Sequence, residues 1–289
     1  MPLTKTGELI TGAAAARSAV AAFNVITLEH VEAVVSGAES VDAPVVLQVS
    51  ENAVKFHDGD VFPLARAASA AAERAAVPVA LHLDHISSDD LLRRAADAGF
   101  GSVMYDASRL PYLDNLTATR AAVEWAHGQG LWIEAELGRV GGKGAAPLDA
   151  HAPGARTDPE EARAFVADSG VDALAVAIGS SHAMTTRTAA LDHALLKRLT
   201  ATLDVPLVLH GSSGVPDDEL RAAVAGGIAK VNIGTALNIA LTGAIREFLA
   251  ARPEVVDPRR YLTAGRAAMA ETVARLIGVV RPEVVIPSA

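Results

Sequence analysis

Three of the nine histidines in this 289-residue chain lie at or just beyond the ends of short apolar runs that predict β-strands: His85, His182 and His210. A catalytic zinc site takes three protein ligands, commonly imidazoles, and keeps a fourth position open for water or substrate. The chain has no cysteine, so any metal site must use His, Asp and Glu. The three histidines therefore predict a catalytic metal site if the fold brings them together. The alternative is that they are buried as packing residues and bind no metal.

Carboxylates stand at the same strand ends. Asp84 directly precedes His85, and Ser87 or Ser88 is better placed than Asp84 to cap the helix that follows. Glu134 and Glu136 alternate along one predicted strand, so both side chains should point to the same face. Two buried carboxylates without a cation would cost several kcal/mol, roughly, so we expect a positively charged partner near them.

The elements that must position these residues alternate regularly. Eight short apolar runs are each followed by an Ala-rich, helix-like segment, which is the pattern of βα units around a parallel sheet. We predict an α/β fold, a (β/α)8 TIM barrel with an additional C-terminal helical region over 257–277, forming one domain over 1–289; an open doubly wound sheet is the alternative. The predicted strands are Val20–Val25, Val45–Val49, Val79–Leu83, Ser102–Tyr105, Leu131–Leu137, Ala173–Ile178, Leu207–His210 and Ala229–Ile233.

Composition argues against several classes of partner. The net charge is −9 and no run of basic residues could follow a nucleic-acid backbone, so we expect no nucleic-acid partner. No window reaches the roughly 18 apolar residues of a membrane span, and the N-terminus lacks the charge and hydropathy pattern of a signal peptide. We therefore expect no membrane partner and a cytoplasmic location.

Glycine-rich loops follow the last three predicted strands. They are Gly179-Ser180, Gly211-Ser212-Ser213-Gly214 and Gly234-Thr235. Backbone N–H groups in loops at this end of a barrel commonly bind a phosphate group. The loops therefore predict a phosphate site. The long Gly/Pro/Ala-rich stretch 138–156 is expected to be a working loop, and its first part, 138–144, to form a mobile flap.

Taken together, these residues resemble the class II fructose-bisphosphate/tagatose-bisphosphate aldolases. The likeness runs almost end to end and in family order. Its motifs are Ala22-Phe23-Asn24-Val25, Leu47-Gln48-Val49-Ser50-Glu51, the run from Val79 to His85, Glu134-Ala135-Glu136-Leu137-Gly138, Leu209-His210-Gly211 and Asp257-Pro258-Arg259.

The resemblance implies a role for each matching residue. Zn²⁺ would be held by His85, His182 and His210, with Glu136 as an auxiliary metal-site carboxylate. Asp84 would act as the acid/base at the C4 oxygen of the substrate, and Asn232 would contact the enediolate. The expected substrate-binding residues are Asn24, Ser50, Gly179, Gly211, Ser213, Thr235 and Arg259, the last as the distal-phosphate arginine, with a monovalent cation near the phosphate site.

The implied reaction is the reversible cleavage of a ketose phosphate, by default fructose 1,6-bisphosphate, to dihydroxyacetone phosphate and an aldehyde. A Lewis-acidic metal can stabilise the enediolate, so no Schiff-base lysine is needed. The partner is thus a small sugar phosphate, and we expect a homodimer or homotetramer.

Some positions depart from the family pattern and leave alternatives open. The flap usually carries an acid after its glycine pair, whereas here Lys143 and Gly144 follow Gly141-Gly142. An altered acceptor pocket would suit tagatose bisphosphate, an inositol-derived deoxy-ketogluconate phosphate or a sulfonated sugar phosphate. A metal-dependent sugar-phosphate isomerase or epimerase, and a non-catalytic sugar-phosphate-binding barrel, are the other two classes.

Overall fold

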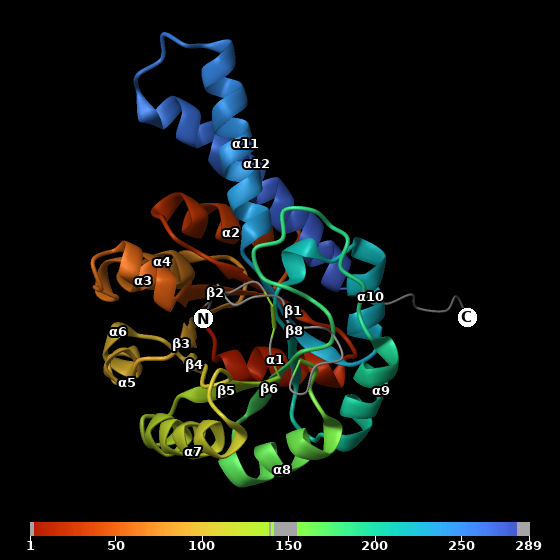
Figure 1. Ribbon diagram of the computed structural model, residues 1–289. Coiled ribbons are helices and arrows are strands. Elements are labelled where there is room, and N and C mark those ends of the chain that lie inside the picture. The colour runs from red at the N-terminus through yellow and green to blue at the C-terminus, as the bar shows by residue number, and fades with distance from the viewer. Residues whose placement is uncertain (1–2, 139, 142–154, 282–289) are drawn as a thin grey trace.

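Eight parallel strands close into a barrel in the computed structural model, in the order β1 to β8 with β8 pairing back to β1 (Figure 1). The structure describes residues 3–138, 140–141 and 155–281. The strands are β1 Val20–Asn24, β2 Val45–Ser50, β3 Val79–Ile86, β4 Ser102–Tyr105, β5 Trp132–Leu137, β6 Ala173–Val176, β7 Leu207–Leu209 and β8 Ile228–Ile233. The prediction of a (β/α)8 barrel is confirmed, and all eight predicted strands are present.

Helices follow the strands and surround the barrel (Figure 1). They are α1 Thr6–Ala15, α2 Leu28–Ser40, α3 Glu51–Phe56, α4 Phe62–Arg74, α5 Asp89–Leu92, α6 Ala95–Ala98, α7 Tyr112–Gly128, α8 Pro159–Ser169, α9 His193–Thr202, the 3₁₀ turn η1 Ser212–Gly214, α10 Asp217–Ala225, α11 Thr235–Ala251 and α12 Pro258–Val280. The predicted C-terminal helical region corresponds to α12 and is confirmed.

The first helix closes the N-terminal end of the barrel. Ile10 of α1 is fully buried against Val20, Val46, Ala80 and Ala229, which all lie near the starts of their strands. Burying one isoleucine side chain contributes about 1.5–3 kcal/mol. α1 therefore closes this end of the barrel largely through apolar contacts.

The last two long helices form an arm that projects from the barrel (Figure 1). Along α11, which is described throughout, Leu237 is the only buried residue, and Ile239 is 47% exposed. The second half of α12 returns to the barrel and buries Met269 and Val273. The arm thus carries apolar side chains that the barrel itself does not cover.

Across the described residues, no helix has both the length and the apolar character that crossing a membrane would require.

A close helix contact seats α12 on the barrel and can be tested. A Cβ at Gly37 of α2 would lie 2.6 Å from the Ala270 carbonyl oxygen and 2.7 Å from Cβ of Val273. We expect Gly37→Ala to lower the free energy of unfolding by about 1–3 kcal/mol, because neither the backbone nor a branched side chain can move aside cheaply. Urea denaturation followed by circular dichroism measures this.

Gly278→Ala is the matched control, because a Cβ there meets no described atom within 4 Å. This substitution should stabilise α12 by about 0.5–1 kcal/mol, since alanine favours the helix over glycine. Equal effects of the two substitutions would contradict the packing described here.

Candidate metal centre

A bulge in β3 turns two adjacent side chains toward the same site. His82 and Leu83 pair with Ser102 and Val103 of β4, but the next pair is Ile86 with Tyr105, so Asp84 and His85 lie opposite one residue. His85 has a φ of 51°, in the left-handed region that a non-glycine residue rarely adopts. In a regular strand these neighbours would point to opposite faces. The bulge is therefore what lets both act at the barrel mouth.

His85, Glu136, His182 and His210 come together at the C-terminal end of the barrel. One potential ligand atom from each lies within 4.8 Å of the others. Nε2 of His85 is 2.8 Å from Nδ1 of His210, and the same Nδ1 is 3.6 Å from Oε2 of Glu136. The structure thus brings together all four residues predicted as metal ligands.

A glycine allows the loops that carry two of these histidines to approach each other. Gly211, directly after His210, has a φ of 67°, and a Cβ there would lie 2.6 Å from the carbonyl carbon of Ser181. His182 is the next residue, and its backbone N–H donates to the carbonyl of Gly141 at 2.8 Å. Gly211 can adopt this left-handed backbone conformation without strain. It also leaves room for the neighbouring backbone, which any side chain at this position would clash with.

Carboxylates behind the cluster orient two of its imidazoles. Nδ1 of His85 lies 2.9 Å from Oδ2 of Asp106, and Nε2 of His210 lies 2.7 Å from Oε1 of Glu134. A neutral ring that donates outward to a carboxylate presents its other nitrogen as a lone pair. Two such lone pairs, on His85 and His210, then face each other at 2.8 Å, an arrangement that a shared cation stabilises. The donor set and its orientation fit a divalent metal ion.

Burial keeps His210 neutral. Its side chain is fully buried, and this burial together with the neighbouring His85 lowers the pKa of His210 to about 4, despite the hydrogen bond to Glu134. At neutral pH the ring is uncharged, so its contact with Glu134 is a hydrogen bond rather than an ion pair. A neutral imidazole is the form that binds a metal ion.

Asp84 lies beside the cluster and is held by two amides. Nδ2 of Asn24 donates to one carboxylate oxygen at 2.9 Å, and Nδ2 of Asn232 lies 3.4 Å from the other. Gln48 in turn donates to Oδ1 of Asn24 at 2.9 Å. Burial alone would raise the pKa of Asp84, but the adjacent His85, His210 and Lys230 outweigh it and hold this pKa well below its usual range. Asp84 is therefore a fixed carboxylate at neutral pH.

Glu134 has the positively charged partner that the sequence led us to expect. Nζ of Lys230, on β8, lies 2.7 Å from Oε2 of Glu134, and both side chains are fully buried. Burial raises the pKa of Glu134, but Lys230 and His210 together lower it to about 2. Lys230 was not among the residues predicted from the sequence to form the site. Its place within an otherwise apolar strand, two residues before Asn232, was the available signal.

The predicted phosphate loops lie next to one another. Oγ of Ser213 accepts a hydrogen bond of 3.1 Å from the backbone N–H of Ala236, which joins η1 to the start of α11 beside Thr235. Gly179 has a φ of 129°, and a Cβ there would lie 2.7 Å from Nη1 of Arg156. Ser50, which pairs with Asp84 across β2 and β3, uses its hydroxyl to cap α3.

Arg259 does not lie with the other predicted site residues. It stands at the start of α12 on the projecting arm, its side chain is 88% exposed, and its guanidinium pairs with Asp257 at 2.7 Å (Figure 1).

Lys143 and Gly144 of the predicted flap fall outside the described residues. Another histidine, His30 of α2, is 2% exposed, and its Nε2 lies 3.3 Å from Oδ1 of Asn238 in α11.

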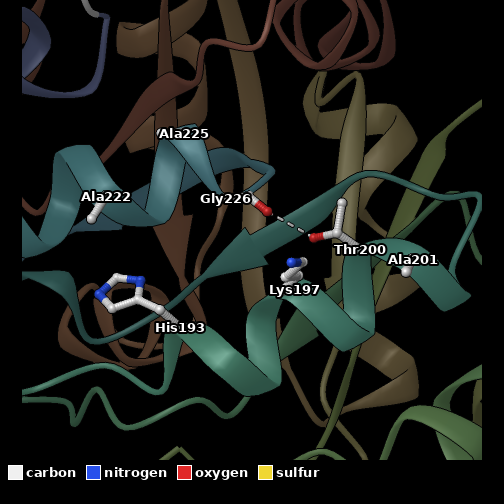
Figure 2. Close-up of a pocket in the computed structure, with 7 residues that line it drawn as sticks. All are labelled: His193, Lys197, Thr200, Ala201, Ala222, Ala225 and Gly226. Carbon is white, nitrogen blue, oxygen red and sulfur yellow. Dashed lines mark hydrogen bonds between the residues drawn. The ribbon is translucent and has the colours of Figure 1, made fainter.

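A separate hollow lies on the outer surface between α9 and α10. Its lining residues are mostly small, and the hydroxyl of Thr200 donates to the carbonyl of Gly226 at 2.9 Å across it (Figure 2). His193 at its edge pairs with Glu219 at 3.0 Å. None of the residues that line this hollow is a predicted site residue, so it is distinct from the barrel mouth.

Comparison with known proteins assigns the class. Residues 4–283 match the family of class II fructose-bisphosphate aldolases, and the chain belongs to this family. It is a metal-dependent aldolase with a sugar-phosphate substrate.

Solved structures of aldolases resemble the whole chain. The YdjI aldolase from Escherichia coli K12 is 32% identical, with 96% of this chain and 97% of that chain covered and a TM-score of 0.84. A protein from Coccidioides immitis assigned as a fructose-1,6-biphosphate aldolase is 30% identical, with 96% of each chain covered and a TM-score of 0.83. Fructose-bisphosphate aldolase from Campylobacter jejuni, at 24% identity, 96% and 95% coverage and a TM-score of 0.79, shares the fold.

Metal analysis of the purified protein tests the cluster. We expect about one metal ion per chain, and His210→Ala should abolish its retention, because three protein ligands are needed to hold a catalytic ion. The matched control is His127→Ala, since His127 lies on the outer surface with a 45% exposed side chain. Metal retained at the wild-type level in His210→Ala would rule out His210 as a ligand.

Proposed function

We propose that this protein is a zinc-dependent aldolase that reversibly cleaves a ketose phosphate, by default fructose 1,6-bisphosphate, to dihydroxyacetone phosphate and an aldehyde. The observation that carries the proposal is the convergence of three imidazoles and Glu136 beside the buried Asp84. Membership of the class II aldolase family supports the reaction type. The name of the 30% identical protein from Coccidioides immitis supports the default substrate.

In this proposal His85, His182 and His210 hold Zn²⁺, and Glu136 is an auxiliary carboxylate. A bound ion would supply Lewis-acid stabilisation of the negative charge that develops on the donor half. Asp106 and Glu134 fix the orientation of His85 and His210 through the hydrogen bonds described above. No lysine is required as a nucleophile. Lys230 is fully buried against Glu134 and is not presented to a substrate.

Asp84 moves the proton in the proposed cleavage. Its carboxylate takes the proton from the C4 hydroxyl as the bond between C3 and C4 breaks, and the electron pair of that bond stays on the donor half. The aldehyde leaves, the donor half takes up a proton at C3 to become dihydroxyacetone phosphate, and Asp84 gives its proton up to water. In the reverse direction Asp84 returns a proton to the C4 oxygen. Asn24 and Asn232 hold the carboxylate for this transfer. Oδ1 of Asn232 is buried with no hydrogen-bond partner among the described residues, which suits a substrate hydroxyl.

The phosphate of the donor half is assigned to the loops after β6, β7 and β8. Gly179, Gly211, Ser213 and Thr235 supply backbone N–H and hydroxyl groups, with a monovalent cation nearby. The adjacency of Ser213 to the start of α11 supports this assignment, because the N-terminus of a helix favours an anion.

We further propose a homodimer or homotetramer. The projecting arm and its uncovered apolar residues support association between copies. Arg259 on this arm lies apart from the site of its own chain. It could therefore contact a distal phosphate only in the site of a neighbouring copy.

An enzyme-coupled assay for dihydroxyacetone phosphate tests the reaction. We expect its release from fructose 1,6-bisphosphate by the zinc-loaded protein, loss of release after chelation, and recovery when zinc is restored. Release that is insensitive to chelation would contradict the metal dependence. If dihydroxyacetone phosphate is released only from another ketose phosphate, that compound replaces fructose 1,6-bisphosphate as the substrate, and the proposed reaction type stands.

The role of Asp84 is tested by Asp84→Ala. We expect kcat to fall by about 10²–10⁴, because the proton on the C4 oxygen loses its acceptor. Metal content and the melting temperature should stay close to wild type. Asp114→Ala, on the exposed face of α7, is the control and should keep full activity. An active Asp84→Ala enzyme would assign Asp84 a structural role instead.

A further inference from the structure

Lys230 is a fully buried charged residue that the proposed reaction does not use. It lies on β8 inside the barrel, and its side chain is 0% exposed. A buried ammonium group is costly unless it is paired and hydrogen-bonded. Its contacts therefore indicate what it does.

Those contacts lead directly to a predicted metal ligand. Nζ of Lys230 donates to Oε2 of Glu134 at 2.7 Å, and the other oxygen of the same carboxylate lies 2.7 Å from Nε2 of His210. Glu134 thus binds the lysine with one oxygen and the imidazole with the other. Because an ionised carboxylate can only accept a hydrogen bond, the ring of His210 donates its Nε2 proton to Glu134 and presents Nδ1 to the cluster.

The lysine is also held from the opposite side. Nζ lies 3.5 Å from Nε2 of His82, and Nδ1 of His82 lies 2.8 Å from the hydroxyl of Ser102. That hydroxyl is 2.6 Å from the hydroxyl of Thr6 in α1. A polar chain therefore runs from the helix that closes the barrel to His210, with Lys230 in its middle.

The position of Lys230 decides how Glu134 can act. Burying the charged carboxylate of Glu134 without a cation would cost roughly several kcal/mol of folding free energy. The carboxylate would then also be free to rotate away from the imidazole of His210. With Lys230 on one oxygen, the other oxygen is aimed at His210 and keeps its negative charge. A carboxylate hydrogen-bonded to the far nitrogen of a metal-binding imidazole fixes the ring and raises its basicity.

From this geometry we propose that Lys230 is a positioning residue for the metal centre: through Glu134 it orients His210 and increases the metal affinity of the site. The inference rests on the proposed metal site. It adds a residue that touches neither the metal ligands directly nor the substrate. A purely structural role would instead affect only the stability of the barrel.

Zinc affinity measured by competition with a chromophoric chelator separates these two roles. We expect Lys230→Met to bind zinc about 10- to 100-fold more weakly than wild type, the usual cost of removing an outer-shell partner. The control is Lys197→Met, the same substitution at an exposed position of α9, which should leave the affinity unchanged. The thermal midpoint of the metal-free proteins is recorded alongside. A lower midpoint with wild-type zinc affinity would overturn the proposal.

The double variant Lys230→Met/Glu134→Gln covers the case in which the single variant does not fold. It removes both charges of the buried pair, so the thermal midpoint of the metal-free protein should recover. We expect its zinc affinity to stay about 10-fold below wild type, because the amide accepts from His210 without a negative charge. Wild-type affinity in this variant would also overturn the proposal. Absence of zinc binding by the wild-type protein would instead refute the metal site itself.

Discussion

The structure depends on placing two carboxylates, Glu134 and Glu136, inside a closed barrel. Both are almost completely buried, so each must be stabilised by the protein or by an ion. Lys230 compensates Glu134 from within the barrel, and Glu136 faces the three imidazoles at its mouth. The apolar seal formed by Ile10 keeps the opposite end closed. The barrel interior is therefore divided into a base that is apolar apart from the contact between Thr6 and Ser102, a charged pair at mid-height and a ligand cluster at the top.

Local backbone strain lies where the chemistry is expected. The bulge in β3 and the positive φ of His85 allow adjacent residues, Asp84 and His85, to face one site. Unfavourable backbone conformations of this kind persist only when the surrounding structure enforces them. Glu51 contributes to this by accepting a hydrogen bond of 2.6 Å from the backbone N–H of Ser87, just beyond the bulge. The proton-transfer group and a metal ligand are thus placed side by side by one distorted strand end.

Sequence reasoning predicted the barrel because the alternation of apolar runs and helical segments is a local signal. It also predicted that His85, His182 and His210 converge, since strand ends of a closed parallel barrel meet at one face. The bulge could not be predicted, because regular alternation places Asp84 and His85 on opposite faces. A cation near Glu134 was expected from the cost of burial. Its identity as Lys230 depends on how β5 and β8, which do not pair with each other, face across the barrel interior. Arg259 lies away from the site because it is carried by the projecting arm, and His30 is buried because the first helix of that arm packs over it. Local sequence patterns do not predict how this arm packs.

The central claim is that three imidazoles hold one metal ion at the mouth of this barrel. X-ray absorption at the zinc edge of the zinc-loaded protein tests it most directly, because the spectrum reports the ligands around the ion. We expect a first shell of nitrogen and oxygen at about 2.0–2.1 Å, with the outer-shell scattering of three imidazole rings. A shell of oxygen alone, or scattering from fewer than three imidazoles, would contradict it.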